Sequence, residues 1–477
     1  MECNKEQEEA IMHRDGPAMV LAGPGAGKTY VITNRVKALI DEYGVKPEQI
    51  LVVTFSKAAA VEMKERFEML TGGQRLPVRF GTFHSVFFQI LRLAYHYEVK
   101  DIATPALKYR FLEETLNETG YEVDDKKEFL SDIEKEISRV KGEGIEIDCY
   151  FSSACSAEIF QKMYRGYQEK LQRHRCLDFD DMVVYTYQLL KEREDIRRRW
   201  QAQFRYLLID EFQDINRLQY ETVCMLAEPE NNLFIVGDDD QSIYGFRGAN
   251  IYNILNFEKH FPEAVTIKLE QNYSSTQNIL NAANGVISNN MGRKRKTLWT
   301  DNEAGKKIGF KQFETGYEEA EYVAKDINAC VKDGRYHYGD CAVLYRTNAQ
   351  SRLFEEKFIV SNIPYKIVGG VNFYARKEIK DLLAYLKTID NARDDLAVRR
   401  IINVPKRGIG ATTLNRVADY AAAADISFYN ALKMADDIPT LGKSAAKIKP
   451  FVNFIQVMRS KVEIISVSEL LQEIIDE

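Results

Sequence analysis

The sequence has few cysteines, no long apolar run and no excess of positive charge, and each shortage excludes a class of protein. Its seven cysteines are scattered over 477 residues without paired or metal-ligand spacing, which argues against a disulfide framework or a structural zinc site. No apolar run is long enough to cross a bilayer, and the N-terminal residues lack the apolar stretch of a signal peptide. We therefore expect a cytoplasmic protein without a membrane partner.

The charge balance leaves nucleic-acid binding open. The net charge is −6, which does not advertise binding to a polyanion, but only the local field of a binding groove matters for that. The densest basic cluster is Arg293-Lys294-Arg295-Lys296, and a bare charge run of this kind is more often a solvated face than a binding site. The length of 477 residues predicts about three domains.

The strongest motif is a glycine-rich stretch between an apolar run at 18–21 and a helix-like segment at 30–36. It reads Ala22-Gly23-Pro24-Gly25-Ala26-Gly27-Lys28-Thr29, and this context is typical of a phosphate-binding P-loop. Glycines let backbone N–H groups close around a phosphate, and the helix N-terminus adds a partial positive charge. We expect Lys28 to reach the β- and γ-phosphates of a nucleotide and Thr29 to place its hydroxyl on Mg²⁺. A ligand-free turn is the less favoured interpretation, although Ala22 stands where the usual pattern has glycine.

Two later apolar runs end in polar groups that suit phosphate chemistry. The run at 206–209 is followed by Asp210 and Glu211; one carboxylate can hold Mg²⁺ through its water shell, and the next can take a proton from an attacking water. The run at 233–237 leads to Gln241, a candidate for contacting the γ-phosphate or orienting that water. An acid pair downstream of a P-loop favours a nucleotide hydrolase over a nucleotide-binding switch.

Aromatic residues near strand ends form a second group of candidates. Phe55 ends a β-branched run that predicts a buried parallel strand, and at that end it faces the crevice where open α/β sheets bind ligands. Tyr244, Phe246 and Arg247 lie on a glycine-flanked loop suited to stacking on nucleobases. Read alone, this loop is equally well explained as a hydrophobic anchor.

The segment from about 86 to 180 is helical in period and poor in strand signals, which predicts an all-α insertion. Just before it, His84 is expected to be a helix cap or a packed side chain. At its end, Asp178-Phe179-Asp180-Asp181 suggests a metal site, but an N-cap followed by an acidic first turn is the favoured interpretation. Ahead of the first strand, Gln7 is suited to reading an adenine edge with its amide or to capping a helix.

Taken together, the motifs resemble those of superfamily 1 DNA helicases of the UvrD, PcrA and Rep group, over essentially the whole chain. Besides the P-loop, the matching stretches are Asn4-Lys5-Glu6-Gln7, Thr54-Phe55-Ser56, Gly81-Thr82-Phe83-His84-Ser85, Leu177-Asp178-Phe179-Asp180-Asp181, Asp210-Glu211-Phe212-Gln213-Asp214, Gln241-Ser242-Ile243-Tyr244-Gly245-Phe246-Arg247-Gly248-Ala249, Leu269-Glu270-Gln271-Asn272-Tyr273, Leu344-Tyr345-Arg346-Thr347-Asn348-Ala349-Gln350-Ser351-Arg352, Val368-Gly369-Gly370 and Val404-Pro405-Lys406-Arg407-Gly408-Ile409-Gly410.

The resemblance implies an α/β fold of the P-loop NTPase class, with RecA-like parallel-sheet cores and inserted all-α subdomains. The first core would comprise residues 1–85 and 180–275, with residues 86–179 as the helical insertion. Residues 276–372 would begin the second core, and residues 373–477 would form part of a helical domain. Alternation of helices with strands such as Ala342-Val343-Leu344-Tyr345 supports the second core independently.

The resemblance also implies ATP and Mg²⁺ as cofactors, with Lys28, Glu211 and Gln241 in catalysis and Thr29 and Asp210 on the metal. In the family, Gln7 reads adenine, Tyr273 stacks on it and Arg35 lies beside the nucleotide. The full set of nucleotide-binding residues would be Gln7, Ala22, Gly23, Pro24, Gly25, Ala26, Gly27, Lys28, Thr29, Tyr30, Arg35 and Tyr273.

For the nucleic acid, the resemblance implies 3′-to-5′ movement on single-stranded DNA, with duplex junctions as substrates and repair or replication proteins as possible partners. The residues of the single-strand track would be Phe55, Thr82, His84, Tyr244, Phe246, Arg247, Arg346 and Asn348.

Two departures from the family pattern lower the expected activity. The family has Asn-Tyr-Arg-Ser where this chain has Asn272-Tyr273-Ser274-Ser275; that arginine reaches the γ-phosphate across the interdomain cleft, and Ser274 has neither its charge nor its planar fork. The chain also stops before the family's last two motifs, which indicates a fragment or a naturally short protein. We expect binding of Mg-ATP with slow hydrolysis, little stimulation by single-stranded DNA and no strand separation, because loss of an arginine finger costs about three to five orders of magnitude in turnover.

Other functions stay open at this point. A nucleotide-gated DNA-binding protein without productive turnover is the main alternative, and Ser274 is its support. The compact insertion disfavours the motor subunit of a helicase–nuclease complex, and the lack of any acceptor-site signal disfavours a P-loop kinase.

Overall fold

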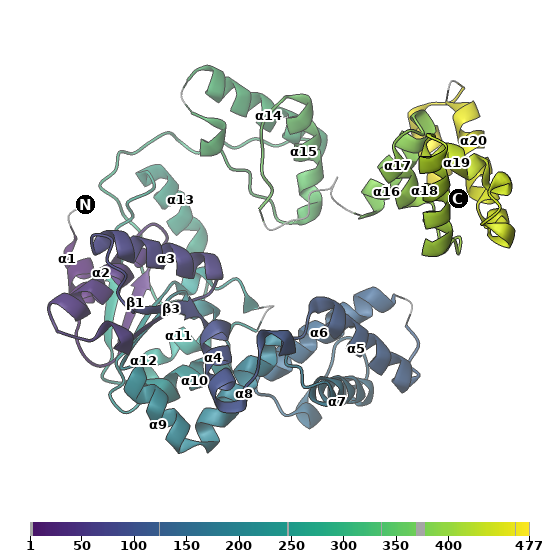
Figure 1. Cartoon of the computed structure of the whole chain (residues 1–477). Coiled ribbons are helices and arrows are strands. Elements are labelled where there is room, and N and C mark those ends of the chain that lie inside the picture. Colours follow the sequence, from purple (N-terminus) through teal and green to yellow (C-terminus); the bar gives the residue numbers. More distant parts are fainter. Residues whose placement is uncertain are drawn as a thin grey trace. The chain divides into compact units, whose positions relative to one another are not determined.

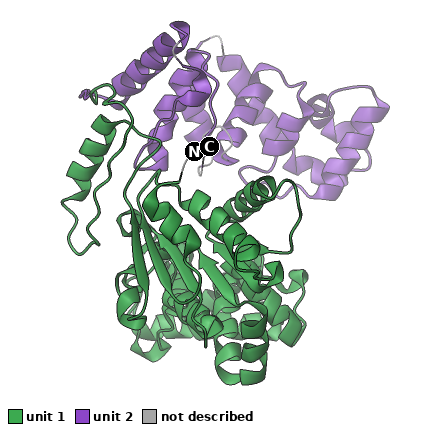
Figure 2. Ribbon diagram, turned by 90° about the vertical axis from the view of Figure 1, so that its left-hand side faces the viewer, with its two compact units in different colours: residues 1–309 green, residues 310–477 purple. Residues whose placement is uncertain are grey.

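The computed structural model describes residues 3–123, 125–245, 248–334, 336–368, 377–462 and 464–476. The chain is divided into two compact units, residues 1–309 and residues 310–477 (Figure 1; Figure 2). Two candidate DNA contacts, Phe246 and Arg247, lie outside the described residues, as does most of the motif at 368–370. Among the described residues, no helix combines the length and apolar character that crossing a bilayer requires.

A six-stranded parallel sheet forms the centre of the first unit, in the order β3-β2-β4-β5-β1-β6. Its register places Leu21 opposite both Gly237 and Lys268, and Thr54 opposite Thr82. The C-terminal ends of the strands therefore meet at one edge, as in other open α/β sheets. The strands are β1 (Ala18–Ala22), β2 (Ile50–Thr54), β3 (Arg79–Thr82), β4 (Tyr206–Ile209), β5 (Leu233–Gly237) and β6 (Val265–Leu269).

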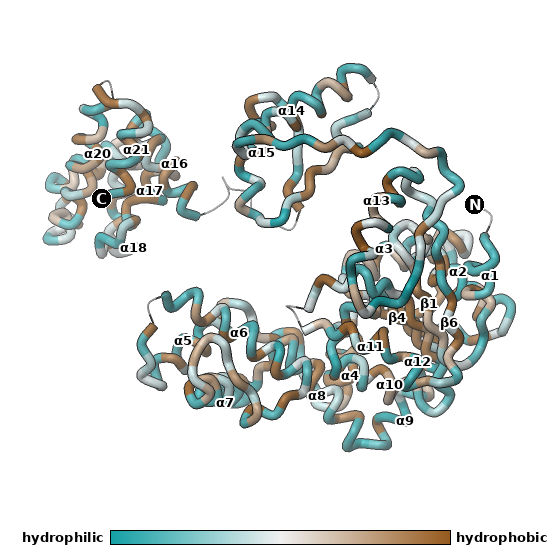
Figure 3. Tube along the Cα trace, turned by 180° about the vertical axis from the view of Figure 1, so that it is seen from behind, coloured by the Kyte–Doolittle hydropathy of each residue, from teal (hydrophilic) through white to brown (hydrophobic). Residues whose placement is uncertain are grey.

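Both faces of this sheet are buried, which explains why its strands are continuous apolar runs rather than alternating ones. In β1, Met19 and Leu21 belong to one hydrophobic cluster, while Val20 belongs to the cluster on the opposite face. The same alternation holds in β2, β4 and β5, and the labelled strands β1 and β4 are largely brown, the hydrophobic colour, in Figure 3. The predicted parallel strands and the α/β class are confirmed.

Helices cover the sheet on both sides. Buried side chains of α1, α2 and α3 form one cluster with the sheet, and those of α4 and α8 to α12 form the other. The helices of the first unit are α1 (Lys5–Met12), α2 (Lys28–Asp41), α3 (Lys57–Leu70), α4 (Phe83–Tyr95), α5 (Pro105–Thr119), α6 (Lys126–Glu143), α7 (Ala157–Arg173), α8 (Phe179–Glu192), α9 (Glu194–Gln203), α10 (Arg217–Ala227), α11 (Tyr252–Leu255), α12 (Phe257–His260) and α13 (Gln277–Ile287).

Between β3 and β4 the described residues form helices and no strand, as the helical period of this segment predicted, while its assignment as a separate inserted domain stays a prediction. Helices α5, α6 and α7 enclose a hydrophobic cluster of their own, centred on Phe111, Ile133, Phe160 and Met163. Helix α6 also packs on α8 and α10, which joins the insertion to the sheet-bearing part of the unit.

The regular elements in the described part of the second unit are all helices, with one hydrophobic cluster around α14 and α15 and another among the later helices. They are α14 (Gly316–Lys332), α15 (Ser351–Val360), α16 (Lys377–Asp390), α17 (Asp395–Ile401), α18 (Ala411–Ala423), α19 (Phe428–Lys433), α20 (Lys449–Lys461) and α21 (Val467–Asp476).

The strand predicted at Ala342-Val343-Leu344-Tyr345 is wrong, because the described residues of the second unit contain no strand. Leu344 is 91% exposed, although its sequence neighbours have the apolar character of a core strand. A strand needs a neighbour to accept and donate its backbone hydrogen bonds, and the described residues of this unit offer none. The proposed division into four subdomains is finer than the two units and stays a prediction.

The separate core of the insertion makes a stability prediction. Phe160 is fully buried and its ring centroid lies 5.0 Å from that of Tyr150, so Phe160→Ala should lower the free energy of unfolding by about 3–5 kcal/mol. Urea unfolding followed by circular dichroism measures this change. Phe151→Ala is the matched control, because Phe151 is 85% exposed and its loss should change stability by no more than about 0.5 kcal/mol. Equal effects of the two substitutions would contradict the assigned core.

Candidate nucleotide-binding site

The P-loop connects the end of β1 to the start of α2. Ala22 is the last residue of β1 and Lys28 the first of α2, with Gly27 before it at a φ of 84°. Gly25 also has a positive φ, 66°, and a Cβ at this position would lie 2.3 Å from Ser274 Oγ. Glycine is therefore required at both positions for backbone conformation, and at Gly25 also for space. No described side chain caps α2, which leaves its first backbone N–H groups free for an anion.

A cavity of about 410 Å³ lies against this loop. Its walls come from α1, the loop, α2, α3 and the segment after β6, through Gln7, Gly25, Ala26, Gly27, Lys28, Thr29, Tyr30, Arg66 and Tyr273. Four residues of the expected set do not line it: Ala22 is buried in the sheet, Gly23 packs against Leu298, Pro24 is engaged through its carbonyl by Asn272, and Arg35 is fully buried. The structure thus brings most of the expected nucleotide-binding residues around one cavity beside the P-loop.

Gln7 and Tyr273 meet at the edge of this cavity. Gln7 Nε2 donates to the Ala26 carbonyl at 3.1 Å, and the Tyr273 hydroxyl donates to Gln7 Oε1 at 3.4 Å. Asn4 is the N-cap of α1 and forms a capping box with Gln7, so the helix-cap interpretation of this motif is confirmed. Gln7 also lines the cavity, and recognition of adenine by its amide stays a prediction.

Two arginines, Arg35 of α2 and Arg66 of α3, differ in their position relative to the cavity. Arg35 is fully buried, donates to the Arg14 carbonyl and lies over the Phe234 ring, where burial lowers its pKa to about 9. It is not among the residues that line the cavity. Arg66 does line it and pairs with Glu62 at 2.6 Å. Sequence reasoning missed Arg66 because only the packing of α3 beside α2 brings it to the cavity.

The acid pair lies at the end of β4, beside the P-loop lysine. Lys28 Nζ is 3.0 Å from Glu211 Oε2, which also accepts from Gln213 Nε2 at 2.9 Å. Glu211 has a φ of 49°, a left-handed conformation that costs a residue with a Cβ about 1–2 kcal/mol and is common at functional sites. Glu211 therefore lies on a locally strained turn, and its side chain contacts Lys28.

Asp210 and Asp214 give this end of β4 an excess of negative charge. Asp210 Oδ1 is buried without a partner, and burial followed by the charge of Glu211 raises the pKa of Asp210 to about 7. The same causes raise the pKa of Asp214 to about 6. A buried carboxylate oxygen without a partner suits a hard divalent cation, so Asp210 fits the expected Mg²⁺. Thr29, the other expected ligand, lines the cavity.

Gln241 ends a short 3₁₀ turn, Asp239–Gln241, after β5. Its Nε2 donates to Asp238 Oδ2 at 2.6 Å, and the backbone N–H of Asp238 donates to Gln213 Oε1 at 2.9 Å. A chain of hydrogen bonds therefore runs from Lys28 through Glu211, Gln213 and Asp238 to Gln241. The structure brings the three predicted catalytic residues into one polar network.

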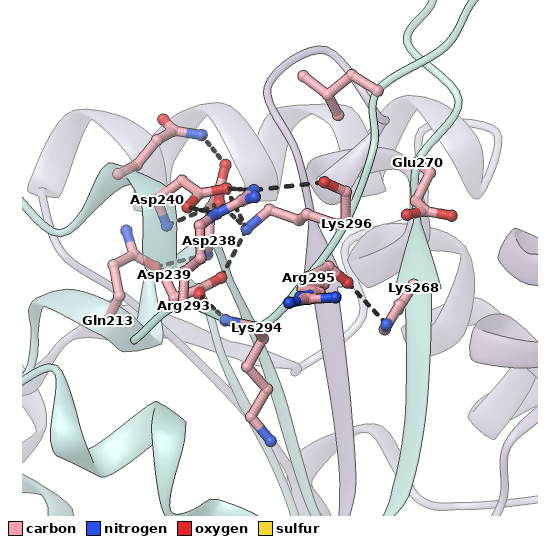
Figure 4. A network of polar contacts seen from close by, with 12 residues as sticks. Gln213, Asp238, Asp239, Asp240, Lys268, Glu270, Arg293, Lys294, Arg295 and Lys296 are labelled. Carbon is pink, nitrogen blue, oxygen red and sulfur yellow. Dashed lines mark hydrogen bonds and ion pairs between the residues drawn. The ribbon is translucent and has the colours of Figure 1, made fainter. Parts of the chain in front are cut away.

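The basic cluster at 293–296 is not a solvated face, contrary to expectation. The Lys296 side chain is only 2% exposed and contacts Asp238, Asp239 and Asp240, while Arg293 pairs with Asp240 (Figure 4). The sequence offered no sign of this pairing, because the basic and acidic residues lie more than 50 positions apart.

Phe55 and Tyr244 form an aromatic pair at the same edge of the sheet. Their ring centroids are 5.2 Å apart with an interplanar angle of 18°, and Phe55 is 42% exposed. Thr82 caps α4 through a capping box with Ser85, and His84 packs edge-on against Phe179. Burial lowers the pKa of His84, in agreement with the packed-side-chain interpretation.

The remaining track residues, Arg346 and Asn348, belong to the second unit, where both are exposed. Their contribution to a common DNA track with Phe55 and Tyr244 stays a prediction.

The acidic motif before α8 is an N-cap, as the favoured interpretation predicted. Asp178 and Asp181 form a capping box, and both also pair with the buried Lys141 of α6, at 2.8 and 2.7 Å. Asp180 accepts from Ser138 at 2.6 Å. These contacts join the insertion to the core through charges that already have partners, which leaves no need for a metal here.

The parallel sheet, the P-loop between strand and helix, and the acid pair at a nearby strand end together define a P-loop NTPase fold. Comparison with known proteins refines this class. Residues 3–262 match the UvrD/REP helicase N-terminal domain, and residues 267–470 match the UvrD-like helicase C-terminal domain. The chain therefore belongs to the UvrD/Rep helicase family.

Curated relatives agree with this assignment. The chain is 42% identical over 487 aligned positions to proteins named ATP-dependent DNA helicase PcrA in Staphylococcus epidermidis and in Staphylococcus aureus. Each alignment covers 99% of this chain and 65% of the relative. The chain thus spans 65% of the length of these relatives.

The cavity predicts how nucleotide binding depends on Lys28. Lys28→Ala removes the cation that faces the phosphate position, so Mg-ATP affinity should fall by at least about tenfold, as expected for loss of a charge-assisted hydrogen bond. Isothermal titration calorimetry with a non-hydrolysable ATP analogue and Mg²⁺ measures this. Lys37→Ala is the control, since Lys37 lies on the same helix but pairs with Asp41 at the surface. Unchanged affinity in Lys28→Ala would remove the basis for the P-loop assignment.

Proposed function

We propose that this chain is the motor part of an ATP-dependent DNA helicase or translocase of 3′-to-5′ direction on single-stranded DNA, and that on its own it binds Mg-ATP and hydrolyses it slowly. The observation that carries the proposal is the common position of Lys28, Glu211 and Gln241 at the carboxyl edge of one sheet, with the stacked pair Phe55 and Tyr244 at that same edge. The names of the relatives support DNA as the substrate. Direction of movement, duplex junctions, repair or replication partners and a cytoplasmic location rest on family resemblance.

Each catalytic side chain has a definite task in hydrolysis. Water attacks the γ-phosphorus, the bond to the β–γ bridging oxygen breaks, and Glu211 accepts the proton that the water loses. Lys28 neutralises charge on the phosphoryl oxygens, and Gln241 contacts the γ-phosphate or orients the water. Mg²⁺, when bound by Asp210 and Thr29, supplies further charge stabilisation to the phosphate oxygens.

The ion pair between Lys28 and Glu211 links binding of the γ-phosphate to the availability of the base. Lys28 Nζ is 3.0 Å from Glu211 Oε2, so in this structure each group is engaged by the other. A bound γ-phosphate competes for Lys28 and frees the Glu211 carboxylate for the attacking water. Formation of the phosphate contact is thereby linked to activation of the base.

Base stacking is the natural use of the aromatic pair. Phe55 and Tyr244 come from separate motifs, one after β2 and one in the loop after Gln241. Tyr244 lies only three positions beyond Gln241, so a change at the γ-phosphate can move the loop that carries it. This short connection can couple the nucleotide bound at the site to the affinity for DNA.

A nucleotide-gated DNA-binding protein with little turnover is the second candidate, and the position of Ser274 favours it. The Ser274 Oγ lies directly against Gly25 of the P-loop, where the family has an arginine. A hydroxyl at this place cannot neutralise phosphoryl charge. Turnover measurements separate the two candidates.

Glu211→Gln tests the hydrolytic function. It keeps the shape of the side chain but removes the base, so steady-state ATP hydrolysis should fall by about two to four orders of magnitude. Affinity for Mg-ATP should stay within about threefold of the unmodified chain, since the phosphate contacts of Lys28 remain. Glu221→Gln is the control, because Glu221 pairs with Arg217 on the surface of α10. An affinity collapse with normal residual turnover would make Glu211 structural.

Tyr244→Ala tests the DNA surface. Loss of one stacking ring should weaken binding of a fluorescent oligothymidine by about 1–3 kcal/mol, with little dependence on base sequence. Tyr252→Ala serves as the control, because Tyr252 is nearby in sequence and 65% exposed. Unchanged DNA affinity together with a lower melting temperature would instead identify Tyr244 as a hydrophobic anchor of its loop.

A further inference from the structure

The segment at 293–300, here called the strap, returns from α13 across the carboxyl edge of the sheet. At its start it contacts the aspartates that follow β5 (Figure 4). Lys296 Nζ lies 2.7 Å from Asp238 Oδ1, 2.6 Å from Asp239 Oδ1 and 2.7 Å from Asp240 Oδ2. Arg293 donates to Asp240 through both Nε and Nη2, and the backbone N–H of Lys294 donates to Asp239 at 2.7 Å.

This cluster is buried, so its charges depend on one another. The side chains of Asp238 and Asp239 have no exposed surface, and that of Lys296 is 2% exposed. Three neighbouring carboxylates have the spacing of a metal site, but the Lys296 ammonium already contacts all three. Like charges at this separation repel one another strongly in a poorly solvated place, and the Lys296 ammonium offsets that repulsion.

Asp238 is also the acceptor that fixes Gln241. The two oxygens of its carboxylate have separate partners: Oδ2 accepts from Gln241 Nε2 at 2.6 Å, while Oδ1 faces Lys296. The backbone carbonyl of Asp238 accepts from the Gln241 N–H at 2.9 Å. The Gln241 amide is therefore held by a carboxylate that is itself held in place by Lys296.

The far end of the strap touches the P-loop side of the same site. The backbone N–H of Asn272 donates to the Trp299 carbonyl at 2.7 Å, and Asn272 Nδ2 donates to the Pro24 carbonyl at 2.6 Å. Leu298 packs directly on Gly23. One short segment thus braces both the P-loop and the turn that carries Gln241.

We propose that Lys296 is a positioning residue for Gln241: acting through Asp238, it holds the Gln241 amide in the orientation that serves the γ-phosphate. This inference rests on the proposed ATP hydrolysis and adds to it a residue outside the P-loop and the acid pair. It assigns a role to a basic cluster whose sequence suggests only a solvated charge run.

Lys296→Met removes the ammonium and keeps most of the side-chain volume. The maximal rate of ATP hydrolysis should fall by about 10- to 100-fold, the usual range for loss of a supporting contact behind a functional group. Mg-ATP affinity should change by no more than about twofold, because the lysine touches no cavity residue. Lys294→Met is the matched control: its Nζ pairs with Glu258 at the surface rather than with the three aspartates, and it should leave the rate unchanged.

A double-mutant cycle with Gln241→Ala separates positioning from general loss of structure. If Lys296 acts through Gln241, Lys296→Met should cause little further loss of rate in the Gln241→Ala background. Multiplicative losses would overturn the proposal, as would an unchanged rate in Lys296→Met alone. The pair Asp238→Asn and Asp239→Asn decides the question should Lys296→Met fail to fold. Each neutralises one carboxylate of the cluster, but only Asp238 accepts from Gln241, so a larger loss of rate in Asp238→Asn is required.

Hydrogen exchange supplies a readout that does not depend on turnover. With Mg²⁺ and a non-hydrolysable ATP analogue, a peptide covering 238–242 should exchange more slowly in the unmodified chain and in Lys294→Met, but lose this protection in Lys296→Met. Absence of turnover in the unmodified chain, with this protection pattern present, would reject the proposed hydrolysis and keep the positioning role. Equal protection in all three proteins would reject the positioning role.

Discussion

Parallel hydrogen bonding of β1 to β5 on one side and to β6 on the other is the constraint on which the site depends. This pairing brings Ala22, Gly237 and Leu269 to the same edge of the sheet, so the P-loop, the Gln241 turn and the segment bearing Tyr273 begin side by side. β4, on the other side of β5, delivers Asp210 and Glu211 to that edge. Four segments scattered over 250 positions become one site because parallel strands share the direction of their carboxyl ends.

Charge is the second constraint, and it is met in two places at this edge. Near β4, Lys28 faces Glu211 while Asp210 keeps a buried oxygen without a partner, so the site is one cation short and suited to a divalent metal. Beyond β5, Lys296 and Arg293 satisfy the three aspartates. The cluster near β4 can therefore bind a cation, whereas the carboxylates beyond β5 already have cationic partners and stabilise the turn that carries Gln241.

Much of this arrangement was predictable from local sequence. Glycines at 25 and 27 predict a loop whose backbone adopts positive φ. The apolar runs at 206–209 and 233–237 predict buried strands, the first followed by Asp210 and Glu211 and the second by the turn that carries Gln241. The strand predicted at 342–345 is not formed, because a strand depends on hydrogen bonds to a neighbouring strand as well as on its own sequence. The segment around Leu344 is apolar, but the described residues provide no partner strand for its backbone groups.

The sequence by itself determined the class of the protein, the P-loop, the acid pair and the helical insertion, because each depends on the order of residues within a short segment. Only the tertiary structure decided that Arg66 and not Arg35 lines the cavity, that Phe55 stacks on Tyr244, and that Lys296 is buried against Asp238. Each of these contacts joins residues from separate segments, and no local pattern records which segments the fold brings together. A run of basic residues has the same sequence whether it faces water or a buried carboxylate, and only packing distinguishes the two.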